Sequence, residues 1–91
     1  PAVTRFSFDH ARERYEHAAR LMGVSDLVEA LARLNEDLKV PRLGECLKND
    51  RAALENAWRK MAEDALASGS PANNPRVPTV EEILALYAEA W

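Results

Sequence analysis

Few side chains in this sequence are of the types that carry chemistry. His10 and His17 stand seven residues apart on a predicted helix, and a rise of about 1.5 Å per residue separates them by roughly 10 Å along its axis. That separation is too large for one metal ion to bind both imidazoles. No further His and no Cys lies near them in the sequence, so we interpret both as solvent-facing residues of a polar helix face.

The single cysteine, Cys46, follows Gly44 and Glu45 and precedes Leu47. A nucleophilic thiol needs a neighbouring base, and a free cysteine is usually a small buried apolar group. We therefore interpret Cys46 as a packing residue. One cysteine also cannot form an internal disulfide, which favours a reducing, cytoplasmic setting.

The remaining candidates also favour structural roles. Trp58 and Trp91 lie on apolar stripes and are interpreted as core or interface anchors. Paired carboxylates with Lys or Arg nearby are typical of solvated helix faces, and they occur at Glu36-Asp37, Glu63-Asp64 and Glu81-Glu82. The sequence has no phosphate-binding Gly-rich loop, no metal-spaced His pair and no Ser nucleophile elbow. A complete active site is therefore not expected in these residues.

The size and charge of the chain limit the classes of protein to which it can belong. The chain has 91 residues, a formal net charge of -3 and 47% hydrophobic residues, which favours one small domain or part of a larger one. Charges of both signs are mixed along the chain, which argues against a nucleic-acid surface, and no apolar run is long enough for a membrane span. The first residue is Pro1 rather than Met, which allows the chain to be a piece of a longer protein.

The first helix is expected after a short lead-in. Residues 1–8 carry apolar side chains without a helical period and are predicted to be extended. Asp9 is the predicted N-cap of a helix over 10–22, and Gly23 is placed to end it in a left-handed conformation. The apolar stripe of this helix consists of Ala11, Tyr15, Ala18 and Met22.

A second helix is predicted over 26–39, with Ser25 as its cap and Pro41 as its stop. It has the clearest amphipathic pattern in the chain, formed by Leu27, Leu31, Leu34 and Leu38. Residues 40–47 then read as a short connector with one helical turn. No later or earlier segment alternates with the period of a strand.

The longest helix is predicted to begin at Asn49 or Asp50, to run to about Ala67, and to be ended by Gly69 and Pro71. Its predicted buried face consists of Leu54, Ala57, Trp58, Met61, Ala65 and Leu66. The last helix runs from Val80 to the terminus and carries Val80, Ile83, Leu84, Tyr87 and Trp91 on one stripe. The predicted fold is all-α, an irregular bundle of four main helices plus a short connector turn.

The segment between these last two helices is the most distinctive in the chain. Residues 68–72 are predicted to be an irregular loop. Pro75 and Pro78 should then make the chain extended and stiff, and Thr79 with Glu82 should form a capping box. A rigid loop that enters a helix N-terminus can present polar groups to a ligand. The other interpretation is a plain helix-helix connector.

Taken in order, several segments resemble the C-terminal end of the iron-containing (group III, metal-dependent) alcohol dehydrogenases. These segments are Pro1 to Ser7, Leu21-Met22-Gly23, Leu38 to Leu43, Met61 to Leu66, Asn74-Pro75-Arg76 and Thr79 to Tyr87. Together they cover essentially the whole chain. The Asn-Pro-Arg motif followed by Thr-x-x-Glu-Ile is moderately specific, and the ordered set is much stronger than any one part.

The resemblance implies a larger enzyme. Its members have an N-terminal α/β domain that binds NAD or NADP through a Gly-rich turn. Their C-terminal helical domain binds Fe²⁺, or sometimes Zn²⁺, through one Asp and three His. The implied reaction is hydride transfer between the nicotinamide and an alcohol or aldehyde carbon. Residues 1–91 would then be the distal portion of the helical domain, without the nucleotide site or the metal ligands, since His10 and His17 do not match the ligand motif.

The resemblance also implies which residues approach the substrate. The family's loop before Asn-Pro-Arg nears the substrate pocket, so the candidate cleft residues are Ser70, Pro71, Asn73 and Asn74. No catalytic, cofactor-binding or metal-binding residue is expected in this chain, which alone should be inactive. The expected partner is the rest of its own polypeptide, with a homo-oligomer as a further option, and neither nucleic acid nor a membrane is expected.

The alternative is an independent helical protein-interaction module without catalytic activity. Exposed apolar surface distinguishes the two hypotheses, because a segment of a larger domain leaves a patch where its neighbours pack. We expect Val3, Phe6 and Phe8 to form part of that patch. A self-standing module would cover these residues or use them in a symmetric dimer.

Overall fold

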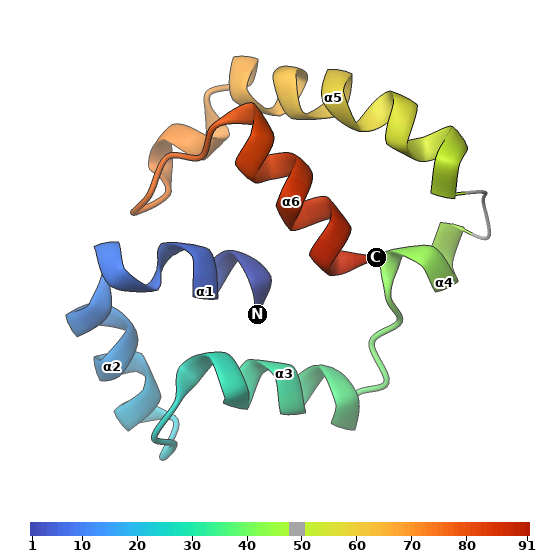
Figure 1. Ribbon diagram of the computed structural model, residues 1–91. Coiled ribbons are helices and arrows are strands. Elements are labelled where there is room, and N and C mark those ends of the chain that lie inside the picture. The colour runs from blue at the N-terminus through green and yellow to red at the C-terminus, as the bar shows by residue number, and fades with distance from the viewer. Residues whose placement is uncertain (48–50) are drawn as a thin grey trace. The chain divides into compact units, whose positions relative to one another are not determined.

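The protein is described by a computed structural model that covers residues 1–47 and 51–91, and within those ranges its regular structure is entirely helical (Figure 1). The all-α class is therefore confirmed. The chain divides into two compact units, Pro1–Val40 and Pro41–Trp91, and each is described by itself. The arrangement of all helices in one bundle stays a prediction. The α-helices are α1 (Ala2–Ser7), α2 (Arg12–Leu21), α3 (Leu27–Asp37), α4 (Leu43–Leu47), α5 (Arg51–Ala67) and α6 (Val80–Ala90), and the 3-10 helices are η1 (Phe8–His10) and η2 (Ser70–Asn73).

The predicted extended lead-in is wrong, because residues 2–7 form helix α1 and residues 8–10 continue it as η1. Helix α1 packs against α3, and Ser7 is completely buried. So short a helix is stabilised mainly by the packing of its buried face rather than by its own propensity. That packing depends on residues some twenty positions further along the chain, so a local pattern does not contain it.

Helix α2 begins two residues later than predicted and ends one residue earlier, at Leu21, and Gly23 terminates it as predicted. Asp9 does not cap it, because its carboxylate forms an ion pair with the Arg12 side chain instead. At the other end Gly23 has a φ of 72°. The Gly23 N–H donates to the Arg20 carbonyl at 3.1 Å and the Val24 N–H to the Ala19 carbonyl at 3.0 Å. These two bonds define the Schellman motif that Gly at this position favours.

Helix α3 is capped by Asp26 rather than by the predicted Ser25. The Asp26 carboxylate accepts a hydrogen bond of 2.9 Å from the Glu29 N–H, so the helix starts one residue later. Its leucine stripe is covered only at the start. Leu27 is 7% exposed, whereas Leu34 is 44% and Leu38 is 66% exposed. The apolar face of α3 is thus left open over its C-terminal half.

The C-terminus of α3 repeats the Schellman motif without glycine. Lys39 has a φ of 53°, the left-handed region that an L side chain enters at a cost. The Lys39 N–H donates to the Glu36 carbonyl at 3.0 Å, and the Val40 N–H donates to the Asn35 carbonyl at 2.8 Å. Two hydrogen bonds therefore hold a lysine in a conformation that Gly23 adopts freely.

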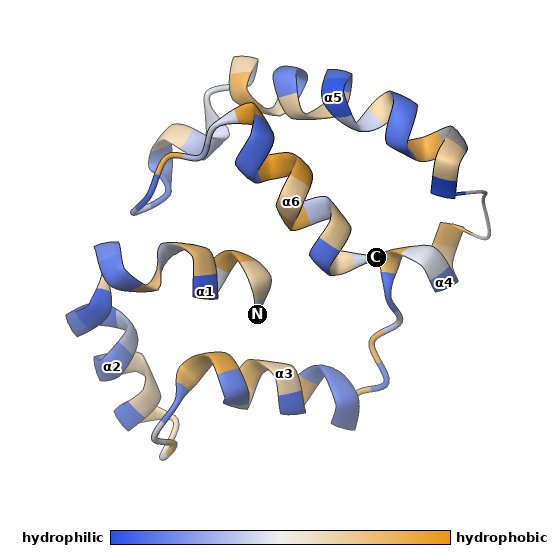
Figure 2. Ribbon diagram, in the orientation of Figure 1, coloured by the Kyte–Doolittle hydropathy of each residue, from blue (hydrophilic) through white to orange (hydrophobic). Residues whose placement is uncertain are grey.

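The second unit has a more complete core. Helix α4 confirms the predicted helical turn in the connector, and the predicted start of the longest helix lies outside the described residues. Helices α5 and α6 pack against each other and bury Trp58, Ala62 and Ile83. In Figure 2, α5 alternates between hydrophilic and hydrophobic segments along its length, as a helix with one buried face does.

The predicted buried face of α5 is wrong at two of its residues and misses a third. Ala62 is completely buried, whereas Met61 is 45% exposed and Ala57 is exposed. The contact therefore follows the spacing of four residues from Trp58 to Ala62. A small residue at the contact lets two helices approach closely.

Aromatic side chains pack against one another in the second unit. The Trp58 ring lies 6.0 Å from the rings of both Tyr87 and Trp91, measured between centroids, and both pairs are tilted. A Cβ atom on Gly44 would lie 2.9 Å from the Trp91 ring, so α4 meets Trp91 only because residue 44 has no side chain. Of the two predicted core or interface anchors, Trp58 is a core residue, whereas Trp91 is half-buried and packs against the Trp58 ring.

Candidate functional site

The predicted irregular loop after α5 is instead the 3-10 helix η2. Gly69 has a φ of 78°, which turns the chain sharply at a cost only glycine avoids. Pro71 then stands in the first turn of η2, where its fixed φ suits a helical start. The Ala72 N–H donates to the Gly69 carbonyl at 3.2 Å, and the Asn74 N–H donates to the Pro71 carbonyl at 3.1 Å.

Side-chain and packing contacts hold the start of this turn. The Ser68 hydroxyl donates to the Ala65 carbonyl at 2.6 Å and accepts a bond of 3.3 Å from the Ser70 N–H. Helix η2 also packs against α5. The loop is thus tied to the end of the long helix.

All four candidate cleft residues lie in or next to η2, so the structure brings them together in one turn. Ser70 and Asn73 are exposed, and Pro71 and Asn74 are half-buried. Hydroxyl and amide groups donate and accept hydrogen bonds but do not ionise near neutral pH. This turn is therefore suited to contacting a polar ligand rather than to acid-base catalysis.

The chain leaves η2 through an extended segment that ends at α6. Asn74 has a ψ of 149°, as the residue before a proline prefers, and Pro78 is buried. The predicted capping box is confirmed. The Thr79 hydroxyl accepts from the Glu82 N–H at 3.3 Å, and the Glu82 carboxylate accepts from the Thr79 N–H at 2.8 Å.

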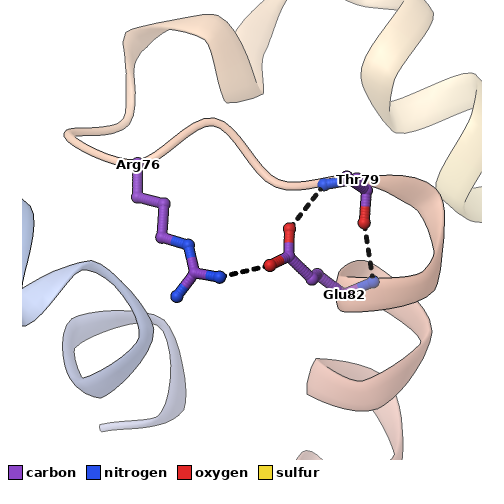
Figure 3. Close-up of polar contacts among 3 residues, drawn as sticks. All are labelled: Arg76, Thr79 and Glu82. Carbon is purple, nitrogen blue, oxygen red and sulfur yellow. Dashed lines mark hydrogen bonds and ion pairs between the residues drawn. The ribbon is translucent and has the colours of Figure 1, made fainter.

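Glu82 has a second partner that sequence reasoning missed. Its other carboxylate oxygen accepts a hydrogen bond from the Arg76 guanidinium (Figure 3). Both side chains are only about one third exposed, at 38% for Arg76 and 31% for Glu82. Figure 3 shows the Glu82 carboxylate between the Arg76 guanidinium and the Thr79 backbone. The only signal in the sequence is an Arg between two prolines shortly before the capping Glu.

These hydrogen bonds alter the acidity of Glu82. The Thr79 N–H stabilises the charged carboxylate most strongly, and the Arg76 guanidinium adds to it, so the pKa of Glu82 lies below its ordinary value. The charged form of Glu82 is therefore favoured in the folded chain. The carboxylate pairs predicted to be solvated are exposed at Glu36, Asp37, Glu63, Asp64 and Glu81, and Glu82 is the exception.

The other candidate residues do not form a site. His10 and His17 are exposed as predicted. Cys46 is exposed rather than buried, because Gly44 turns its own side of the short helix α4 toward Trp91 and residue 46 lies about 200° around the helix from it.

A metal site is not found in the part of the chain that the structure describes. Nowhere in residues 1–47 and 51–91 do three His, Cys, Asp or Glu side chains come close enough to hold an ion. The residues present thus do not fit the metal that the resemblance implies for the parent enzyme. The helices in these ranges are also too short or too polar to cross a membrane.

Comparison with known proteins agrees with the resemblance. The model of the C-terminal part of the Fe-containing alcohol dehydrogenase family matches residues 1–91. The chain is 33% identical to an alcohol dehydrogenase of Thermococcus barophilus and 35% identical to the lactaldehyde reductase of Escherichia coli. All of the chain is aligned in both cases, and it spans about a quarter of each relative, 25% and 26%. No solved structure gives a significant match. The chain belongs to the Fe-containing alcohol dehydrogenase family and corresponds to its C-terminal part.

Proposed function

We propose that residues 1–91 are the distal portion of the helical domain of an NAD(P)-dependent, metal-dependent alcohol dehydrogenase. The complete enzyme interconverts alcohols with aldehydes or ketones by hydride transfer, and it works in the cytoplasm, where a lone cysteine such as Cys46 stays reduced. The observation that carries this proposal is the family match over the whole chain. Both named relatives are oxidoreductases of alcohols or aldehydes.

The nicotinamide and the metal ion are bound by other parts of the polypeptide in this proposal. Residues 1–91 then contribute support and shape, and alone they are inactive.

Exposed apolar side chains support the view that the chain packs against further polypeptide. The predicted patch was only partly right, because Val3 is exposed whereas Phe6 and Phe8 are half-buried. Most of the exposed large apolar side chains belong to other residues, namely Leu21, Met22, Leu34, Leu38, Val40, Leu43, Leu47, Met61 and Val77. Met22 and Leu34 also border a groove of about 460 Å³ along α3. These side chains are the candidates for a surface that contacts further polypeptide, because a contiguous exposed apolar patch marks an interaction site.

The turn formed by η2 forms one wall of the substrate cleft in this proposal. Ser70 and Asn73 present polar groups, and Pro71 limits the flexibility of the turn. A wall of this kind chooses among substrates by shape and hydrogen bonding. The proposed role is therefore specificity, and the chemical step is left to groups elsewhere in the enzyme.

The test is an assay of the full-length polypeptide that contains this chain. Oxidation of NADH and of NADPH is followed with lactaldehyde and with a series of linear and branched aldehydes, with Fe²⁺ or Zn²⁺ supplied. We expect turnover with at least one coenzyme and its loss on removal of the metal by a chelator.

The control is the 91-residue chain under the same conditions, which should give no turnover. Intact-mass measurement of the native polypeptide tells whether residues 1–91 belong to a chain about four times as long, as the relatives' coverage suggests. A native polypeptide of 91 residues, or a longer one without activity toward any alcohol or aldehyde, would contradict the proposal and favour the interaction module.

A further inference from the structure

We propose that Glu82 is a positioning residue for the substrate cleft: through Arg76 it holds the segment that connects η2 to α6. The proposal rests on the proposed function, because it takes η2 as a wall of that cleft. It goes beyond the capping box, which by itself would only stabilise the start of α6.

The two oxygens of the Glu82 carboxylate have different partners. One accepts the Thr79 N–H at 2.8 Å, and the other accepts the Arg76 guanidinium. A capping box needs the first bond only, and a Gln at this position would serve it equally well. The bond to Arg76 needs the second oxygen and the negative charge. Glu82 thus has one function for the helix and another for the loop.

The position of Arg76 makes this second bond effective. Arg76 lies between Pro75 and Pro78, whose rings fix two backbone angles of the segment. The two prolines stiffen the segment, but the backbone of Arg76 and Val77 between them is not fixed in this way. A side-chain bond from Arg76 to helix α6 restricts that freedom. Because η2 directly precedes this segment, the same bond fixes where Ser70 to Asn74 lie.

The other end of the loop is held independently, by the contacts of Ser68 and by packing of η2 on α5. Helices α5 and α6 pack on each other. The contacts of Ser68 and η2 are made to α5, and the Arg76–Glu82 pair is made to α6. The loop is therefore bridged across two packed helices, and the Arg76–Glu82 pair is the attachment on the α6 side (Figure 3).

A neighbouring ion pair provides the matched control. Glu81 precedes Glu82 on α6 and pairs with Arg59 at 2.9 Å, with both side chains more than half exposed. That pair links α5 to α6 and does not involve the loop. Glu81→Gln therefore removes one negative charge and one ion pair from the same helical turn while leaving Arg76 bound.

The experiment compares three variants of the full-length enzyme, Glu82→Gln, Arg76→Gln and Glu81→Gln, by amide hydrogen exchange and by steady-state kinetics. In Glu82→Gln the amides of Ala72 and Asn74 should exchange about threefold or more faster, and KM for the aldehyde should rise about fivefold with kcat and coenzyme KM unchanged. Glu81→Gln should match the wild type in both measurements. Arg76→Gln breaks the same pair from the loop side and leaves the capping box intact.

The double variant Arg76→Gln/Glu82→Gln completes a cycle. If the two residues act through their bond, its KM should equal that of the single variants rather than the product of their effects. Exchange in Glu82→Gln equal to that in Glu81→Gln would overturn the proposal. Faster exchange with an unchanged KM would also overturn the positioning role. A wild-type enzyme without turnover would refute the proposed function, whichever exchange result is found.

Discussion

The two units of this chain differ in how far each completes its own core. In Pro41–Trp91 two packed helices bury Trp58, Ala62 and Ile83, and aromatic rings close the end of the unit. In Pro1–Val40 the buried apolar side chains are Ala19 and Leu27. Small domains stand close to the limit of stability. The second unit is therefore expected to hold its own structure, whereas the first depends on whatever covers its exposed leucines.

The largest predicted effect concerns the core of the second unit. Trp58→Ala should destabilise the full-length protein by about 3–5 kcal/mol, because it removes a large buried ring and leaves a cavity. Thermal unfolding measures the loss. Glu63→Ala is the control on the same helix and should cost much less, since the Glu63 side chain is exposed. Equal losses in the two variants would show that the two sides of α5 are buried alike in the whole protein.

The next prediction tests whether the first unit is covered by further polypeptide. An exposed leucine substitution is usually worth less than about 0.5 kcal/mol, whereas a covered leucine costs about 2–4 kcal/mol on truncation. We expect Leu38→Ala to behave as covered in the full-length protein and as exposed in residues 1–91 alone. Chemical denaturation of both forms gives the comparison.

The control for that experiment is Glu36→Ala, an exposed residue on the same helix. It should change neither form appreciably. A Leu38→Ala variant that is as stable as the wild type in the full-length protein would show that the open face of α3 is a true surface, and the contrast between the two units would then lose its explanation.

A smaller effect on stability is expected at the C-terminal ends of α2 and α3 in the first unit. Lys39→Gly should stabilise the protein by about 1 kcal/mol, because Lys39 adopts a positive φ that glycine enters without strain. Gly23→Ala should destabilise it by about the same amount for the same reason. Paired unfolding midpoints measure both changes. The two changes in stability must have opposite signs. Changes of the same sign would contradict the left-handed conformation of these two residues.

The smallest prediction is a dependence on pH in the second unit. The pKa of Glu82 is lowered on folding, so its stabilising effect is complete above the ordinary value of 4.5 and is lost as the pH falls through the lowered pKa. Unfolding midpoints measured from neutral pH downward should therefore fall less steeply in Glu82→Gln than in the wild type. Parallel curves for the two proteins would contradict the prediction.

The features that the sequence alone determined are those encoded within a few neighbouring residues. Gly23 ends α2, Thr79 and Glu82 begin α6, and the leucine spacing specifies α3 as a helix. Each depends on a backbone angle, a capping bond or a helical period that spans one or two turns. The resemblance to the alcohol dehydrogenases likewise depends on ordered local motifs, and the family match confirms it.

What only the tertiary structure decided is which of these residues meet. Helix α1 exists because it packs on α3, Ala62 rather than Met61 faces α6, and Arg76 reaches the second oxygen of Glu82. The candidate cleft residues gather in one turn because Gly69 reverses the chain there. Burial and side-chain pairing depend on neighbours that the fold supplies, whereas caps and periods depend on the chain itself.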